Sequence, residues 1–136
     1  MSRITARKVD LDVREELILD AALVVFAEKS FHGASLPEIA REAGVAVGTI
    51  YLHFKSKETL ANALYRRCQN DYLQVVYGDI PDQATVEEVV FTSCRRVAEY
   101  IQRNPLVLRF LELHDHSSYL DGKSRQLQRR HVDRIA

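Results

Sequence analysis

The sequence predicts an all-α protein, because composition and hydrophobic spacing both favour helices. Only 5 glycines and 3 prolines occur among 136 residues, well below their usual share. Hydrophobic residues make up 46% of the chain and recur mainly at helical spacing. A chain of this length buries roughly two-thirds of its unfolded surface, which is enough for a core without disulfides or metals. Collagen-like, low-complexity and disordered classes are therefore excluded.

Helices are predicted first over residues 13–29, where apolar side chains form one stripe at i, i+3/i+4 and i+7/i+8 spacing. Ser35 and Glu38 have the spacing of a capping box, which starts a short second helix. Gly44 ends this helix, since glycine readily adopts a positive φ. A third short helix is expected over about residues 47–53.

Further helices follow, separated by breakers and begun by capping residues. Ser56 is an N-cap candidate, and Thr85 with Glu88 forms a second capping box. The expected helices cover about residues 56–77, 85–103, 105–114 and 123–136. The last of them contains no stop signal, so we expect the chain to end within a helix.

Charge and cysteine content restrict the environment of the protein. Lys and Arg total 19 and Asp and Glu total 19, so any nucleic-acid binding must depend on a local basic surface. Cys68 and Cys94 form neither a disulfide framework nor a CxxC metal pair, and a reducing, cytoplasmic location is expected. The longest apolar run, residues 21–27, is too short to cross a membrane, and no signal peptide is recognised.

Residues 35–57 carry the strongest functional signal. They form a helix, a tight glycine turn, a short helix and a cationic corner, which is the arrangement of a helix-turn-helix whose second helix enters the DNA major groove. With Ile50 and Phe54 turned inward, the outer face presents hydroxyls, apolar groups and a glycine that permits close backbone approach. No acidic residue lies between Val45 and Lys57, which suits a phosphate backbone. Spacing alone leaves a purely structural helical hairpin open.

The sequence Ala43–Leu60, with Leu17–Ala22 and Glu38–Ala40, closely resembles the DNA-binding domain of TetR-family transcriptional regulators. The resemblance covers about residues 15–65. It implies an all-α dimeric repressor with a three-helix DNA-binding domain and a variable ligand-binding domain. We therefore expect a DNA-binding domain over residues 1–55 and part of an effector-binding and dimerisation domain over residues 56–136.

The expected DNA contacts combine this resemblance with the chemistry of the exposed face. The resemblance implies DNA contacts from Thr49, Tyr51 and His53, whereas a packing tyrosine and a partly buried helix-capping histidine are the alternatives. The full expected set is Ser35, Val47, Gly48, Thr49, Tyr51, Leu52, His53, Lys55 and Lys57.

The resemblance also implies that Ser35 and Lys57 meet phosphate. Val47 and Leu52 have the apolar character to touch thymine methyl groups. Family members usually continue for two further long helices that form the dimer interface. A homodimer is therefore expected where those helices are present.

The expected function is sequence-specific binding of double-stranded DNA by a ligand-responsive transcriptional repressor that recognises a palindromic operator as a dimer. An effector of unidentified structure is expected among the helices of residues 56–136. Its candidate lining is mostly apolar with two phenols: Tyr72, Val76, Phe91, Tyr100, Leu108 and Leu111. The same residues are equally compatible with a hydrophobic core.

Two other functions remain open. One is a helical carrier of a small molecule or lipid with a vestigial helix-turn-helix. The other is a monomeric regulator fragment that pairs with a full-length relative. Binding of specific DNA, and its dependence on Tyr51, distinguishes these from the expected repressor.

No enzyme, cofactor or metal site is expected. The sequence contains no nucleophile motif, phosphate-binding loop or HExxH pair. His114, Asp115 and His116, with His131 further on, suggest a metal site. A polar loop that lines or closes a cavity is the favoured interpretation, because histidines two residues apart diverge on a helix.

Overall fold

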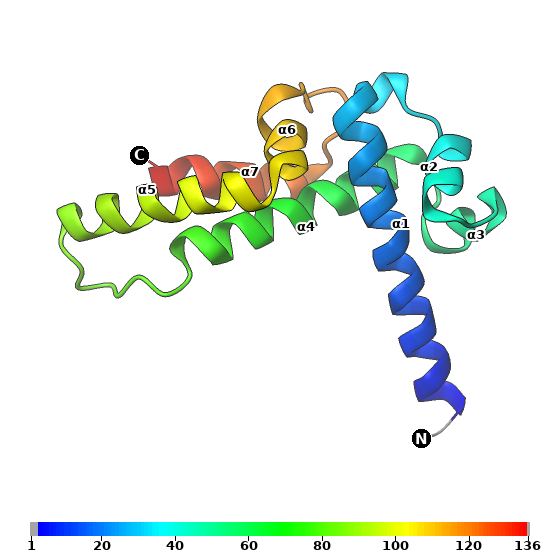
Figure 1. Cartoon of the computed structure of the whole chain (residues 1–136), viewed down its shortest axis with the longest axis horizontal. Coiled ribbons are helices and arrows are strands. Elements are labelled where there is room, and N and C mark those ends of the chain that lie inside the picture. Colours follow the sequence, from blue (N-terminus) through cyan, green and yellow to red (C-terminus); the bar gives the residue numbers. More distant parts are fainter. Residues whose placement is uncertain (1–2, 136) are drawn as a thin grey trace. The chain divides into compact units, whose positions relative to one another are not determined.

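The computed structural model describes residues 3–135, with side chains described for residues 10–112 and 114–130. The regular structure of this part is entirely helical (Figure 1), as predicted. Its helices are α1 (Arg3–Gly33), α2 (Leu36–Ala43), α3 (Val47–His53), α4 (Lys57–Tyr77), α5 (Val86–Arg103), α6 (Pro105–Leu113) and α7 (Gly122–Ile135). None of these helices combines the length and apolar character needed to cross a membrane.

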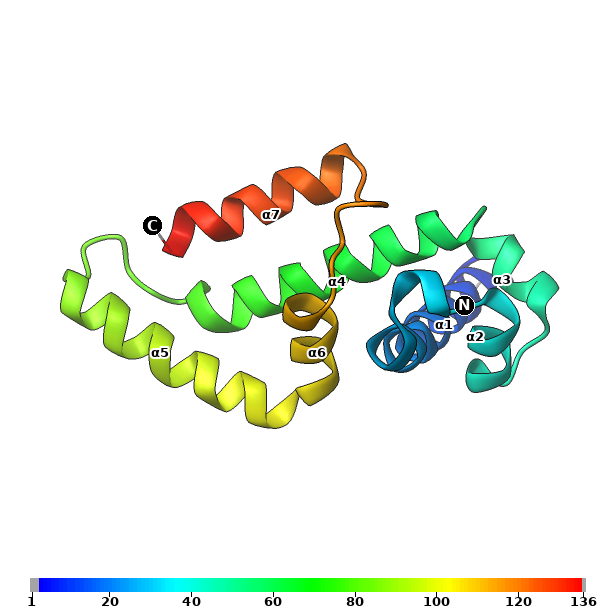
Figure 2. The same cartoon turned by 90° about the horizontal axis from the view of Figure 1, so that it is seen from above.

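The chain divides into two compact units, residues 1–64 and residues 65–136. The first contains α1, α2, α3 and the start of α4, and the second contains the rest of α4 with α5, α6 and α7. In the second unit, α5 and α7 lie on opposite sides of α4 (Figure 2). The expected boundary of DNA-binding function, between residues 55 and 56, stays a prediction.

Helix α1 is longer than predicted. It begins at Arg3 rather than near residue 13, because residues 3–12 contain no glycine or proline that would end a helix. At its other end, Ser30 has φ 64° and ψ 175°, and the chain kinks before the last turn. This conformation is costly for a residue with a side chain, so the surrounding packing must hold it.

The core of the first unit lies where α1, α2 and α3 meet. Ile18 and Phe26 of α1 are completely buried together with Ile39 of α2. Ile50 is also completely buried and Phe54 is 7% exposed, which confirms the predicted inner side of α3. Apolar burial on this scale is the main stabilising contribution to a small helical unit.

The two ends of α2 have the predicted chemistry. The Ser35 hydroxyl oxygen accepts a hydrogen bond from the Glu38 backbone N–H at 3.3 Å. Gly44 has φ 73° and ψ 30°, and its N–H donates to the Arg41 carbonyl at 3.2 Å. The chain therefore reverses between α2 and α3 through a left-handed glycine.

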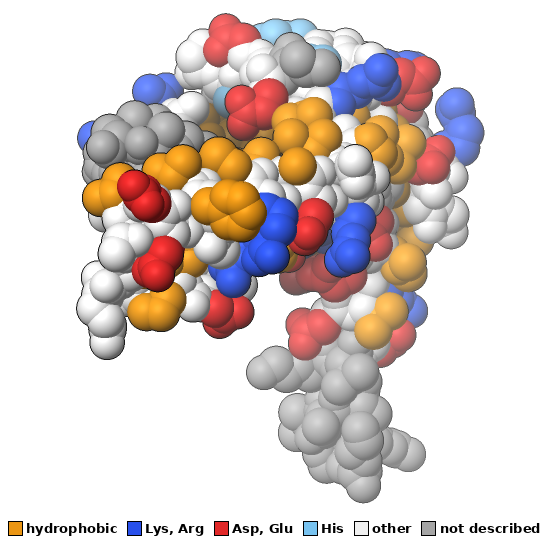
Figure 3. All heavy atoms as spheres, turned by 60° about the vertical axis from the view of Figure 1, so that its left-hand side comes forward, with side chains coloured by type: hydrophobic (Ala, Val, Ile, Leu, Met, Phe, Trp, Pro, Cys, Tyr) orange, Lys and Arg blue, Asp and Glu red, His pale blue; other side chains and the backbone are white. Residues whose placement is uncertain are grey.

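The helix limits of the second unit agree with the predicted ranges to within one residue at each end. Val76, Tyr100 and Phe110 are buried in its core. The Thr85 capping box is complete, since Glu88 N–H donates to the Thr85 hydroxyl at 3.2 Å and Thr85 N–H donates to the Glu88 carboxylate at 2.9 Å. Hydrophobic side chains of α5 nevertheless reach the surface, as the orange patches in Figure 3 illustrate, and Val86 is 80% exposed.

His116 is part of the second unit's core. One ring nitrogen, Nδ1, pairs with the Tyr119 hydroxyl, and the other faces the Leu111 carbonyl oxygen at 3.3 Å. The ring meets Tyr65 and Phe110 edge to face. Both nitrogens are thus engaged, one with the Tyr119 side chain of the same loop and the other with the backbone of α6. The His131 side chain lies outside the described residues.

We predict that Gly44→Ala lowers the free energy of unfolding by about 1 kcal/mol, because a Cβ is unfavourable at positive φ. Thermal or urea unfolding measures this effect. Gly48→Ala is the matched control: Gly48 is helical and a Cβ there meets no atom within 4 Å. It should leave stability unchanged or raise it. Equal losses in both variants would contradict the prediction.

We also predict that acid destabilises the second unit through His116. Burial lowers the pKa of this imidazole from its ordinary value of 6.5, with smaller opposing effects from backbone hydrogen bonds. The unfolded chain therefore takes up the proton more readily, and stability falls as the pH drops below about 6.5. Unfolding midpoints measured across this range should fall more steeply for the parent protein than for His116→Gln. Parallel profiles would show that His116 is not responsible.

Candidate nucleic-acid interface and effector pocket

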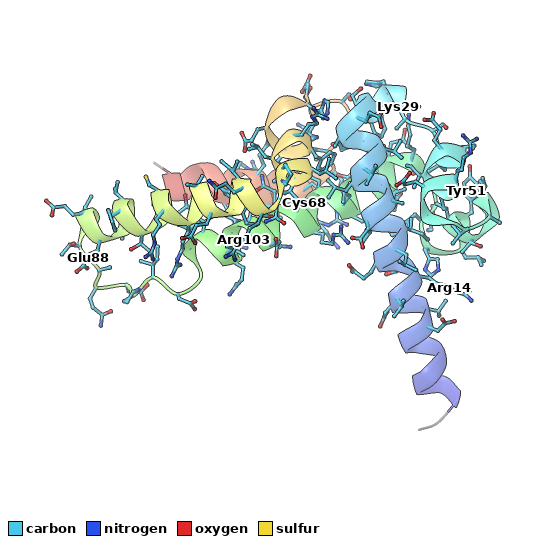
Figure 4. The ribbon with its side chains drawn as sticks, in the orientation of Figure 1. Arg14, Lys29, Tyr51, Cys68, Glu88 and Arg103 are labelled. Atoms are coloured by element: carbon cyan, nitrogen blue, oxygen red, sulfur yellow. The ribbon has the colours of Figure 1, made fainter. Side chains whose placement is uncertain are left out.

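The outer face of α3 is the best-formed candidate interface in the first unit. Its Tyr51 is 56% exposed and its Leu52 is 78% exposed, whereas Ile50 between the helices is buried. Tyr51 is labelled in Figure 4, on α3. These two large side chains lie next to each other on the solvent side of α3 and are available to a partner.

Other predicted residues of α3 frame this face. Gly48 is exposed, and the space beside its Cα is open. Val47 and Thr49 are half-buried, and Lys55 is exposed just after the helix. The structure therefore brings Val47, Gly48, Thr49, Tyr51, Leu52 and Lys55 together on α3 or directly after it.

Lys57 lies at the start of α4 and is anchored to the end of α1. Its ammonium donates to the Phe31 carbonyl at 2.9 Å and to the Ala34 carbonyl at 3.2 Å. It also stands 4.4 Å from the centre of the Phe31 ring. A positive charge at the C-terminal end of a helix is favourable, because the terminal carbonyls carry partial negative charge. The structure thus gives Lys57 a structural role, and its predicted phosphate contact remains a prediction.

His53 turns inward. Its side chain is only 5% exposed, and Nδ1 lies 3.4 Å from the Glu15 carboxylate of α1. Its other nitrogen, Nε2, is buried and has no hydrogen-bond partner among the described residues. This arrangement matches the alternative interpretation of a partly buried residue at the end of α3.

Ser35 is also engaged within the fold. Its hydroxyl caps α2 and donates to the Glu38 carboxylate at 3.1 Å. Glu38 in turn pairs with Lys29 of α1, and this hydrogen bond is the main cause of the lowered pKa of the Glu38 carboxyl. A negative charge close to the helix-turn-helix is thereby paired with a cation.

The second unit contains a cavity of about 330 Å³ between α4, α5 and α6. Its lining consists of Tyr72, Val97, Tyr100, Ile101, Val107, Leu108, Leu111 and Glu112. Tyr72, Tyr100, Leu108 and Leu111 were predicted from the sequence. A cavity of this volume is at the lower end of the range for small-molecule sites.

The other two predicted lining residues lie elsewhere. Val76 is completely buried in the core, and Phe91 is 73% exposed on α5. Phe91 lies six residues before Val97 and ten before Ile101, so its side chain points to a different side of α5. Glu112 of α6 also lines the cavity but was not predicted, since a single carboxylate forms no recognisable pattern in the sequence.

The two phenols of the cavity are arranged edge to face. The Tyr72 and Tyr100 ring centres are 5.3 Å apart, with an interplanar angle of 82°. The Tyr100 hydroxyl donates to the Asp71 carboxylate at 2.8 Å. Burial is the main cause of the raised pKa of Tyr100, and the Asp71 hydrogen bond raises it further. Tyr100 therefore remains a neutral phenol at physiological pH.

Residues 18–64 match the family described as bacterial regulatory proteins, tetR family. The Bacillus subtilis fatty acid metabolism regulator protein is 41% identical over 71 residues, which cover 52% of this chain and 37% of that protein. The present chain thus spans less than half the length of this curated relative.

Solved structures extend the similarity to most of the chain. A tetR-family transcription regulator from Shewanella superposes with a TM-score of 0.75 at 27% identity, over 90% of this chain and 68% of that one. The Bacillus subtilis regulator FadR, solved with stearoyl-CoA, has a TM-score of 0.66 at 28% identity, over 88% and 63% respectively.

Helix α2, the Gly44 turn and the exposed helix α3 form a helix-turn-helix. Residues 18–64, which match the tetR-family model, lie wholly within the first unit.

We predict that Lys57→Met destabilises the first unit by about 1–3 kcal/mol, because two terminal carbonyls lose a charged donor. Chemical unfolding measures the difference. Lys55→Met is the matched control, since Lys55 is exposed and should change stability by less than about 0.5 kcal/mol. If Lys57→Met is as stable as the control, the two carbonyl contacts do not stabilise the fold.

Proposed function

We propose that this protein is a sequence-specific DNA-binding transcriptional regulator. The observation that carries the proposal is the two-sided character of α3. Ile50 and Phe54 fix the helix on one side, and Tyr51 and Leu52 are left exposed on the other. A helix held in this way is suited to the major groove of B-DNA, which admits one α-helix.

In this proposal, the exposed residues read the operator and the anchored ones hold the helix in position. Val47, Gly48, Thr49, Tyr51 and Leu52 face base edges and the nearby backbone, and Lys55 meets phosphate. Ser35, His53 and Lys57 border the interface and mainly position it, with phosphate contacts available to Ser35 and to the remaining donor of Lys57.

We further propose that a homodimer recognises a palindromic operator. A two-fold dimer reads half-sites about one DNA turn apart, roughly 34–36 Å. Members of the TetR family, which residues 18–64 resemble, usually provide the dimer contacts from two long helices of the C-terminal domain. Because the operator is chromosomal DNA, the proposal places the protein in the cytoplasm, and it involves no catalytic step.

The cavity of the second unit is proposed as the effector site. Most of its lining is apolar, which favours an organic ligand with a substantial hydrophobic part. The structure of a relative with bound stearoyl-CoA supports a ligand-responsive role. Binding must favour one DNA-binding state by about 5.5 kcal/mol to shift a population from 1:99 to 99:1. We propose that α4, which contributes to both units, carries this response.

Selection of binding sites from a random duplex pool tests the DNA-binding proposal. It should be done near physiological salt, because affinity depends strongly on ionic strength. Enrichment of a near-palindrome would support a dimeric regulator, and a single half-site would support a reading head without the dimer. Absence of enrichment would favour the carrier alternative.

We predict that Tyr51→Ala weakens binding to the selected operator by about 1–3 kcal/mol and relaxes specificity at the contacted position. Lys55→Met should instead weaken binding to all sequences similarly and reduce the salt slope by about one unit. Titrations on specific and scrambled duplexes at several salt concentrations measure both effects. An unchanged operator affinity in Tyr51→Ala would assign the recognition face to other residues.

A further inference from the structure

We propose that the cavity between α4, α5 and α6 selects an organic cation, an apolar body that carries an ammonium or similar head group. This inference rests on the proposed effector role of the same cavity. It goes further because it assigns the charge of the ligand, and it separates this chain from a regulator whose ligand is an anion.

The charged group at the cavity is a carboxylate. Glu112 is part of the lining, and no Lys or Arg is among the residues that line this cavity. Within the described part of the chain, Glu112 makes no ion pair. A ligand ammonium would therefore find a counter-charge here, whereas a carboxylate or phosphate would meet repulsion without a compensating cation.

The hydroxyl of Tyr100 also favours a cationic ligand over an anionic one. Its hydroxyl proton is directed to Asp71, so its oxygen can accept a hydrogen bond from a ligand but has no second proton to donate. Asp71 also places another negative charge behind this phenol. Both features favour a ligand that donates hydrogen bonds over one that accepts them.

The aromatic pair adds an attraction that requires no formal negative charge. Tyr72 and Tyr100 meet edge to face in the cavity wall, so their ring faces point in different directions. Aromatic faces attract ammonium groups by about 0.5–1 kcal/mol at exposed sites and more where water is excluded. Burial raises the pKa of Tyr72, with smaller effects from Tyr77 and the Glu112 carboxylate, which is consistent with Glu112 acting near this ring.

The remaining lining sets the chemistry of the apolar part. Val97 and Ile101 of α5 and Val107, Leu108 and Leu111 of α6 line a cavity of about 330 Å³. A phenylalkyl group has the size and apolar character to occupy this space. The inferred ligand differs in charge from the stearoyl-CoA bound to the Bacillus subtilis regulator FadR.

A set of three probes tests the inference: phenylbutylamine, phenylbutanol and phenylbutyrate, which share one hydrophobic body and differ in charge. Calorimetric titration into the purified chain near pH 7 should show the amine binding about tenfold more tightly than the alcohol, and the acid most weakly. Glu112→Gln should reduce the amine to about the affinity of the alcohol. Tyr72→Leu should weaken the amine more than the alcohol.

Glu99→Gln is the matched control. It removes the same charge from an exposed position on α5 that does not line the cavity, so the tenfold preference should persist. Circular dichroism of each variant verifies that the helices are retained.

Equal affinity for amine and alcohol, or a preference for the acid, would overturn the inference. If no probe binds but stearoyl-CoA does, the charge assignment fails and the effector proposal survives. If neither the probes nor stearoyl-CoA bind, the effector proposal fails as well, while the DNA selection still tests the regulator independently.

Discussion

The attachment of the Lys57 ammonium to the end of α1 is a polar contact that ties the start of α4 to the rest of the first unit. The Ser30 kink breaks the regular helix before its last turn, and Lys57 then satisfies the Phe31 and Ala34 carbonyls. Lys57 belongs to α4, so these hydrogen bonds connect the start of α4 to the end of α1. Because α3 lies between α2 and α4 in the chain, this connection limits the positions that α3 can take. The position of the exposed face of α3 therefore depends in part on a contact made by α4.

Local signals were sufficient to predict most of the fold. The Ser35 and Thr85 caps, Gly44 and the Asn104–Pro105 break act within a few residues, so their effect can be read from the sequence. The start of α1 was placed too late because the absence of a breaker is a weaker signal than its presence. The Ser30 kink has no local signature, since serine is not a residue that favours this conformation.

The candidate sites were predicted less completely, for a different physical reason. Helical spacing distinguishes the inner from the outer side of α3, and this separated Ile50 from Tyr51 correctly. It does not show which distant residue meets an inner side chain, so the approach of Glu15 to His53 was not foreseen. In the second unit, helical spacing places Phe91 and Tyr100 on opposite sides of α5, but it does not show which of those sides faces α4 and α6.

The exposure of Tyr51 and Leu52 has a consequence for how such a protein can diversify. Side chains with little contact to the core can be exchanged at low cost in stability, whereas Ile50 and Phe54 cannot. If α3 reads DNA as proposed, its specificity can change while the residues that hold this seven-residue helix in place stay the same.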